Sequence, residues 1–372
     1  MPKLPLPNAR GDRRALARGQ WHRFVCHLRV LLAACLLAAG CSPDRVESNL
    51  PFAGERLYVF NWSDYLDPEL IPEFERRTGA RVQYDNFASE SELDTKLLTG
   101  GGGYDVVFPS DHSMVVLVEK DLLAELDKSL LPNLQYIDPQ FLDPPYDPGC
   151  RRSVPYFWGT LAIGIRSDRV AGPVDGFGVL FDERYRGRIT MLDDAENVVG
   201  AMMMHLGHSI NSVDDAHLAE VKRLLERQRP LVQAYTSDAY KEKLIKGEAW
   251  VVLGWSGDIV QAAAENDNIR AVVPAGGTML WVDSMAIPKA SKNQRLAHAF
   301  INFLLDPEIA ARNAEYVAYP TPNLAARELL DAETLANPAV YPPESVLRRC
   351  ERLRDRGPAI AKIEKLWREV RQ

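Results

Sequence analysis

The chain has 372 residues, of which 46% are hydrophobic and 26% are charged, and its 51 acidic residues outnumber its 44 basic ones for a formal net charge of −7. This composition is typical of a globular chain long enough for two cored domains, and it argues against a disordered chain and a polytopic membrane protein. We also expect no nucleic-acid partner, because a general nucleic-acid binder needs a basic surface to neutralise phosphates.

The first 40 residues differ from the rest in charge and hydropathy. They carry seven basic residues and one acidic residue, which leaves 37 basic and 50 acidic residues, a net charge of −13, in the remaining 332. The apolar run at 30–40 is too short to span a bilayer, where about 20 residues are needed. A basic stretch, a short apolar run and small residues in this order are typical of a secretory signal peptide, which we predict for 1–40.

The sequence Ala38-Ala-Gly-Cys41 at the end of the apolar run resembles the lipobox of bacterial lipoproteins, in which the cysteine is acylated and becomes the mature N-terminus. This resemblance implies a periplasmic lipoprotein that is anchored to a membrane through Cys41, with 41–55 as its tether; plain secretion is the alternative. An oxidising compartment would permit a disulfide between Cys150 and Cys350. Nothing in the sequence shows that these two cysteines meet, so their pairing stays open.

From Leu57 onward, short apolar runs alternate with helical patterns, which predicts an α/β fold. Gly79 is expected to end the first helix, and Ser89-Glu-Ser-Glu92 fits a capping box that begins the second. In chain order, strands are predicted at 57–62, 81–85, 104–109, 161–166, 188–192, 249–253 and 281–288. Helices are predicted at 68–78, from 89, and at 196–207, 214–228, 238–246, 257–265 and 294–305.

Signatures of catalysis and of cofactor binding are mostly absent. The glycine run at 100–103 lacks the Lys-Ser/Thr of a phosphate loop and precedes a strand, so we expect a turn. His205 and His208 lie three residues apart on a predicted helix, but no third metal ligand is in register, and a packed or solvated helix face is the better interpretation. No Ser-His-Asp or Cys-His arrangement stands out. We therefore predict no enzyme activity, no metal and no cofactor.

Three of the seven tryptophans are followed closely by an aspartate, each at the end or edge of a predicted strand. Residues two apart on a strand share a face, so such a pair would present an aromatic ring beside a carboxylate. Carboxylates accept charge-assisted hydrogen bonds from ammonium groups, and ring faces attract cations and pack on methylenes. The alternative is a set of core tryptophans near helix-capping aspartates. The pairs are Trp62-Ser-Asp64, Trp255-Ser-Gly-Asp258 and Trp281-Val-Asp283.

At these residues the sequence resembles the polyamine-binding periplasmic proteins of ABC importers, the spermidine/putrescine family, over nearly all of the chain after the leader. The motifs that carry the resemblance are Phe60-Asn-Trp-Ser-Asp-Tyr65, Tyr104-Asp-Val-Val-Phe-Pro-Ser110, Pro155-Tyr-Phe-Trp-Gly159, Leu192-Asp-Asp-Ala195, Trp281-Val-Asp-Ser-Met-Ala-Ile-Pro288 and Tyr319-Pro-Thr-Pro-Asn-Leu-Ala-Ala326.

The resemblance implies the two-lobe periplasmic-binding-protein fold of type II, with crossover strands as the hinge and a ligand cleft between the lobes. Lobe 1 would comprise 56–160 and about 283–320, and lobe 2 would comprise 161–282 with the C-terminal helices to 372. The implied protein is a non-enzymatic monomer that binds a polyamine of the putrescine or spermidine class and delivers it to an ABC permease in the inner membrane.

The resemblance also implies roles for individual residues in the cleft. Aromatic side chains would enclose the methylene chain of the ligand, aspartates would bind its ammonium groups, and two hydroxyls would add hydrogen bonds. Asp258 matches an aspartate that is typical of putrescine-preferring members. The implied aromatic residues are Trp62, Tyr65, Trp255 and Trp281, the implied aspartates are Asp64, Asp194 and Asp283, and the implied hydroxyls belong to Ser110 and Tyr319.

Three positions depart from the family pattern. His112, which we include among the ligand-binding residues, stands where the family often has tyrosine or phenylalanine. Asn197, with Glu196 beside it, stands at a glutamate that helps to bind amines, and Leu353 stands at a glutamine of spermidine binders. A site that lacks one carboxylate should lose more affinity for a triamine than for a diamine, so these changes favour a diamine or a modified ligand.

Two other classes of function stay open at this point. The same fold could serve as a polyamine sensor that docks on a signalling receptor instead of a permease. A cleft hydrolase could use paired carboxylates such as Asp193 and Asp194. Neighbouring residues on a strand point to opposite faces, which disfavours that pair as a catalytic couple.

Overall fold

The computed structural model of the protein describes residues 50–87, 89–100 and 102–372. Residues 54–372 form one compact unit. The predicted signal peptide and Cys41 lie outside the described residues. Within the described part of the chain, no helix has both the length and the apolar character that crossing a membrane requires.

The strands of residues 54–372 join into one mixed sheet. They are β1 (Arg56–Trp62), β2 (Arg81–Phe87), β3 (Val106–Val107), β4 (Ser153–Arg166), β5 (Ile189–Met191), β6 (Val232–Tyr235), β7 (Val251–Trp255), β8 (Ile269–Val272) and β9 (Leu280–Ala286). Their order is β2-β1-β3-β9-β4-β7-β5-β6, with β8 paired to β4. The strands β1, β2 and β3 are parallel, as are β5, β6 and β7, whereas β4 and β9 pair antiparallel.

Helices follow or precede most of these strands. They are α2 (Leu70–Thr78), α3 (Glu90–Leu98), α4 (Asp111–Glu119), α5 (Ala195–His205), α6 (Asp215–Gln228), α7 (Tyr240–Ile245), α8 (Ser256–Glu265), α9 (Gln294–Leu304), α10 (Pro307–Val317), α11 (Leu324–Arg327), α12 (Ala332–Ala336), α13 (Glu344–Leu347) and α14 (Ile360–Arg371). Short 3-10 helices lie in several of the connections.

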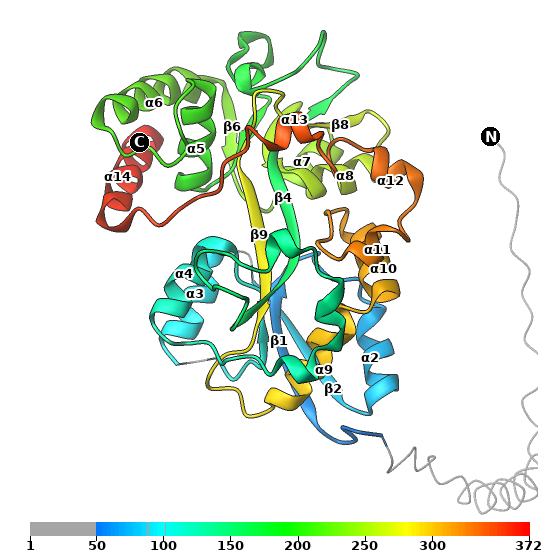
Figure 1. The fold of residues 1–372 in the computed structure, drawn as a ribbon. Coiled ribbons are helices and arrows are strands. Elements are labelled where there is room, and N and C mark those ends of the chain that lie inside the picture. Colours follow the sequence, from blue (N-terminus) through cyan, green and yellow to red (C-terminus); the bar gives the residue numbers. More distant parts are fainter. Residues whose placement is uncertain (1–49, 88, 101) are drawn as a thin grey trace, which may run out of the picture. The chain divides into compact units, whose positions relative to one another are not determined.

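The long strands β4 and β9 run side by side between two halves of the fold (Figure 1). We call the half with β1, β2, β3, α2, α3, α4, α9 and α10 the lower lobe, and the half with β5, β6, β7, β8, α5, α6, α7, α8 and α14 the upper lobe. Parallel strands with helices on their faces are the expected consequence of alternating strand and helix patterns. The paired strands β4 and β9 connect the two lobes, as the predicted hinge would.

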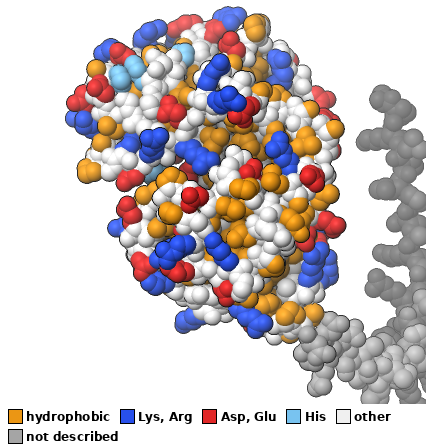
Figure 2. Space-filling view, viewed as in Figure 1, with side chains coloured by type: hydrophobic (Ala, Val, Ile, Leu, Met, Phe, Trp, Pro, Cys, Tyr) orange, Lys and Arg blue, Asp and Glu red, His pale blue; other side chains and the backbone are white. Residues whose placement is uncertain are grey.

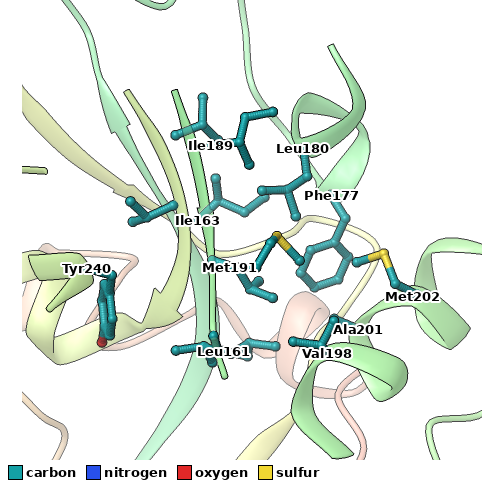
Figure 3. Close-up of a cluster of buried hydrophobic side chains, with 14 of the residues drawn as sticks. Leu161, Ile163, Phe177, Leu180, Ile189, Met191, Val198, Ala201, Met202 and Tyr240 are labelled. Carbon is teal, nitrogen blue, oxygen red and sulfur yellow. The ribbon is translucent and has the colours of Figure 1, made fainter. Parts of the chain in front are cut away.

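The upper lobe buries apolar side chains on both faces of its sheet (Figure 3). Met191 of β5 and Phe177 point toward α5, where they meet Val198 and Met202, while Tyr240 of α7 lies on the opposite face. All five side chains are buried. A strand that is covered on both faces has no polar side, which is why the strand predictions here rested on short continuous apolar runs.

Local signals placed several element ends correctly. Gly79 ends α2 in the left-handed conformation, with φ of 78°, which glycine adopts at little steric cost. The Ser89 side chain accepts a hydrogen bond from the backbone N–H of Glu92 at the start of α3, which confirms half of the predicted capping box.

The strand β4 is much longer than predicted. The prediction covered 161–166, whereas β4 begins at Ser153 and its first half pairs with β9. Pro155 lies inside this half and argues against a strand, because proline cannot donate to the ladder. The pairing register shifts between Pro155 and Phe157, and this irregularity accommodates the proline. The predicted strand at 104–109, in contrast, shrinks to Val106–Val107.

The C-terminal helices pack on different lobes. α11 packs against α10 in the lower lobe, and α14 packs against α5 and α6 in the upper lobe. The segment between them carries Glu351, which pairs with Met279 in an isolated bridge next to β9. The predicted lobe boundaries as a whole stay a prediction.

Charged side chains do not gather by sign on the face that Figure 2 shows. Basic and acidic side chains are interspersed over it, with hydrophobic side chains between them. The net negative charge of the chain is therefore not concentrated in one acidic patch on this face.

Candidate functional site

Four aromatic rings form a row between the lobes. The ring centroid of Tyr65 lies 5.5 Å from that of Tyr319, Tyr319 lies 5.0 Å from Trp281, and Trp281 lies 6.0 Å from Trp255. Each pair is close to perpendicular, as aromatic pairs prefer. We call these four residues the aromatic row. Its rings can pack on methylenes and attract cations through their faces.

Two glycines make room for the aromatic row. Gly159 of β4 is opposite Trp281 of β9, and a Cβ atom at Gly159 would lie 2.4 Å from Cζ2 of Trp281. A Cβ atom at Gly257, at the start of α8, would lie 2.6 Å from the ring of Tyr319. Both distances are far below van der Waals contact, so any larger residue at either position would displace an aromatic ring.

Trp62, the remaining aromatic residue that was predicted to enclose the ligand, lies apart from the row. Its ring packs on Phe87, with centroids 4.4 Å apart, and its Nε1–H donates to the carbonyl oxygen of Phe108 at 3.0 Å. Trp62 therefore supports the end of β1 in the lower lobe. A role for Trp62 in ligand binding stays a prediction.

Three carboxylates lie close together where β9 passes the first residues of α3 and α4. They are Glu90, Asp111 and Asp283, which we call the acidic centre. Ser110 connects two of them, because its backbone N–H donates to Oε1 of Glu90 at 3.0 Å and its backbone pairs with that of Asp283. Asp283 is 5% exposed and Asp111 is 7% exposed. The site therefore holds carboxylates that are almost removed from water.

Burial raises the pKa of every carboxyl in the acidic centre. The pKa of Asp283 lies well above its usual value because of burial, and the charges of Glu90 and Asp111 raise it further. Burial raises the pKa of Asp111 to about 7, although Arg352 lowers it. Among the described residues, none of the three acids forms an ion pair, and Oε2 of Glu90 and Oδ2 of Asp111 have no hydrogen-bond partner. Buried carboxylates in this state favour a cation.

Asp258 and Asp194 are predicted site residues that are hydrogen-bonded but not paired with a cation within the described residues. The hydroxyls of Tyr240 and Tyr319 donate to Asp258 at 2.6 and 2.9 Å. Asp194 caps α5 and accepts from the backbone N–H of Asn197 at 2.9 Å. Burial raises the pKa of both aspartates in spite of these bonds. Asp258 thus joins the aromatic row to the upper lobe through Tyr319.

Asp64 does not lie where its spacing from Trp62 predicts. The prediction placed both residues on one face of a strand, but β1 ends at Trp62 and Asp64 has a φ of 54°, so the face-sharing argument is wrong here. The Asp64 side chain is 67% exposed and accepts from Nζ of Lys241 at 2.8 Å. This contact joins the loop after β1 to α7 in the upper lobe.

His112 also makes a contact between the lobes. Its Nε2 lies 3.4 Å from Oε1 of Glu196, at the start of α5. Glu196 also forms an ion pair with Arg356, whose side chain is only 3% exposed, whereas the His112 contact would be an ion pair only with a protonated ring. Asn197 is buried, and its Oδ1 has no hydrogen-bond partner among the described residues. Glu196, the neighbour of Asn197, is thus already paired with Arg356 within the chain.

Sequence reasoning missed Glu90 and Asp111 of the acidic centre. Each directly follows a serine that precedes a helix, Ser89 before α3 and Ser110 before α4. A serine followed by an acid at a helix start is a common capping pattern, because helix N-termini favour negative charge. The pattern was visible for Glu90, but only the tertiary structure, in which α4 packs on both α3 and β9, shows that these acids lie together.

Cys150 and Cys350 are not joined in the structure. Cys150 is buried and its Sγ lies 3.6 Å from the carbonyl oxygen of Phe141, while Sγ of Cys350 lies 3.4 Å from that of Val346. Both thiols are free, so the disulfide that the sequence left open is absent here.

Comparison with known proteins agrees with this arrangement. The model of the family described as bacterial extracellular solute-binding protein matches residues 69–342. The chain belongs to this family. Membership of this family makes the protein a solute-binding protein rather than an enzyme, as its relatives and structural neighbours are.

Relatives of this solute-binding protein carry polyamines in their names. The spermidine/putrescine-binding periplasmic protein of Salmonella typhimurium is 34% identical over 345 residues, which cover 92% of this chain and 98% of the relative. The putrescine/cadaverine-binding protein of Pseudomonas aeruginosa is 32% identical over 357 residues, which cover 92% and 99%. The structure of the spermidine/putrescine ABC transporter substrate-binding protein PotD from Streptococcus pneumoniae matches with a TM-score of 0.77 at 38% identity, covering 85% and 98%. These matches confirm the family resemblance and the predicted two-lobe fold.

The carboxylates proposed for a cleft hydrolase do not form a catalytic couple. Asp193 is exposed and forms an ion pair with Arg371 of α14, whereas Asp194 caps α5. The two side chains therefore serve separate structural contacts.

Proposed function

We propose that this solute-binding protein binds a polyamine of the putrescine or spermidine class between its lobes and delivers it to an ABC permease. The acidic centre is the observation that carries the proposal. Three carboxylates lie close together, two of them almost fully buried, with no cation of the chain paired to them among the described residues. An ammonium group would supply both the missing charge and the missing hydrogen-bond donors. The names of the relatives support this choice of ligand.

The proposal assigns a role to each part of the site. One ammonium group binds Asp283, with Glu90 and Asp111 close by. The methylene chain packs along the aromatic row, where apolar contact and cation attraction act together. A second ammonium group binds near Asp258 or Asp194, which belong to the upper lobe. A ligand that contacts carboxylates of both lobes favours closure of the lobes around it.

Isothermal titration calorimetry tests this function. The purified protein is titrated with putrescine, cadaverine, spermidine and spermine, and a thermal-shift assay is run with the same amines. We expect at least one polyamine to bind and to raise the melting temperature, because a ligand that binds only the folded state stabilises it. No heat and no thermal shift with any of them at millimolar concentration would overturn the proposal.

Two finer parts of the proposal need their own tests. Delivery to a permease predicts that deletion of the gene lowers uptake of labelled polyamine by the cells; unchanged uptake together with polyamine binding would favour a sensor on a signalling receptor. Anchoring through Cys41 predicts a lipid-modified N-terminus in the membrane fraction by mass spectrometry. Cys41→Ala should then release the protein from that fraction.

A further inference from the structure

Lys241 is a lysine of α7 that lies at the edge of the proposed binding site. Its Nζ donates to Oδ2 of Asp64 at 2.8 Å and to Oε1 of Gln261 at 3.0 Å. The Lys241 side chain is 21% exposed, so most of its stem is covered. This ammonium group belongs to the chain itself, and it binds one of the aspartates that the family resemblance assigns to the ligand.

Lys241 is next in sequence to a residue that contacts the inner part of the site. The preceding residue, Tyr240, donates its hydroxyl to Asp258 at 2.6 Å. The charge of Lys241 lowers the pKa of Asp258 and the charge of Asp64 raises it, although burial has the larger effect. Lys241, Asp64 and Asp258 are therefore close enough to interact. An ammonium group of a ligand that continued outward from Asp258 would meet Lys241 and Asp64 next.

A cavity of about 470 Å³ adjoins the ion pair of Lys241 and Asp64, which both line it. Four further acids line the same cavity, Glu265, Glu315, Asp331 and Glu333. The outer end of a long polyamine would find negative charge there. Asp64 and Lys241 therefore share a wall of this acidic cavity.

We infer that Lys241 is a specificity-determining residue, which binds Asp64 as the third ammonium group of a triamine would and so restricts the site to diamines. This inference rests on the proposed function. The unusual backbone of Asp64 supports it, because a non-glycine residue with φ of 54° is held there by its surroundings. Asp64 is aimed at a cation, and the chain supplies that cation from 177 positions away.

Calorimetry of Lys241→Met tests the inference, because methionine keeps an unbranched side chain of similar length and removes the charge. The quantity measured is the ratio of the affinities for spermidine and putrescine. Freeing Asp64 should raise this ratio about tenfold, which corresponds to one partly exposed charge-assisted hydrogen bond. Lys246→Met is the matched control, because Lys246 ends the same helix and pairs with the exposed Glu242 at 2.7 Å. Lys241→Arg keeps the charge and should keep the ratio of the unaltered protein.

A double variant distinguishes two roles of Lys241: occupying the position of a ligand ammonium group at Asp64, and only holding the two lobes together. In the Lys241→Met protein, the further change Asp64→Asn should remove the gained affinity for spermidine. If both affinities fall by the same factor in Lys241→Met, or if the ratio is unchanged while putrescine still binds, the inference is overturned and the proposed function stands. If the unaltered protein binds no polyamine, the proposed function itself fails.

Discussion

The end of β1 and the middle of β9 each carry a tryptophan that is followed two residues later by an aspartate, and the two aspartates have opposite environments. Asp283 stays within β9, is 5% exposed and has no cation partner among the described residues. Asp64 lies beyond the end of β1, is 67% exposed and binds Lys241. Equal spacing along the chain therefore leads to a buried acid within β9 in one case and, in the other, to an exposed acid that contacts the opposite lobe.

This difference separates the acids near the proposed site into two groups. Among the described residues no ion pair neutralises the acidic centre, although Arg352 lowers the pKa of Asp111, so its carboxylates are costly when ionised and favour a cationic ligand. Asp64 and Glu196 have internal cations, Lys241 and Arg356, which connect them to the other lobe or to the C-terminal segment. The first group is suited to recognising a ligand, and the second group shapes and limits the site around it.

The largest expected effect is on stability, from removing the internal cation of Glu196. Arg356→Met removes the buried cation beside the partly buried Glu196 and leaves His112 at 3.4 Å from it, and breaking such a pair should lower the free energy of unfolding by about 4 kcal/mol. Urea unfolding measures the change. Arg354→Met is the control, because Arg354 is exposed in the same segment. A change below about 1 kcal/mol would show that Glu196 does not depend on its internal cation.

The next effect concerns the pH dependence of Asp111, a buried acid that forms no ion pair among the described residues. The pKa of Asp111 is about 7 in the folded protein against a usual 3.8, so the folded state holds a proton that the unfolded state has lost. Asp111 therefore lowers the stability of the ligand-free protein as pH rises from about 4 to about 7. Asp111→Asn should remove this dependence. Between pH 4.5 and 7.5 the variant should lose about 3 kcal/mol less free energy of unfolding than the unaltered protein. Thermal and urea unfolding across that range measure it, and an unchanged slope contradicts the assignment.

Removing the buried charge of the acidic centre should affect ligand affinity more than stability. Asp283→Asn should weaken polyamine binding about a hundredfold, since a buried ammonium–carboxylate contact is lost, while the ligand-free protein should be at least as stable. Calorimetry and thermal melting measure the two effects. Asp267→Asn, which removes an exposed charge in the turn before β8, is the control. Equal affinity in both variants would place the ligand elsewhere.

The smallest expected effect is the contribution of the Lys241–Asp64 pair to stability. Because Asp64 is mostly exposed, water screens the pair, and Lys241→Met should change the free energy of unfolding of the ligand-free protein by less than about 1 kcal/mol. Urea unfolding beside the Lys246→Met control measures this. A much larger loss would make Lys241 a structural residue, and the contrast between Asp64 and Glu196 would then disappear.

Local patterns in the chain were sufficient to predict much of the fold. Alternating apolar strands and helices predicted the α/β architecture, and single residues such as Gly79 and Ser89 placed helix ends, because such signals depend only on backbone conformation within a few residues. Trp281 and Asp283 also followed from sequence, since both stay inside one strand. The family motifs led to most of the residues that the structure brings together.

Tertiary packing alone decided which acids have a cation. Asp64 and Lys241 are 177 positions apart, and Glu196 and Arg356 are 160 apart, so no local pattern connects them. The environment of Asp111 and Glu90 likewise depends on the packing of α4 on both α3 and β9. Whether a carboxylate is exposed, paired or buried without a partner is set by the elements that fold around it, and that environment determines whether it can bind a cationic ligand.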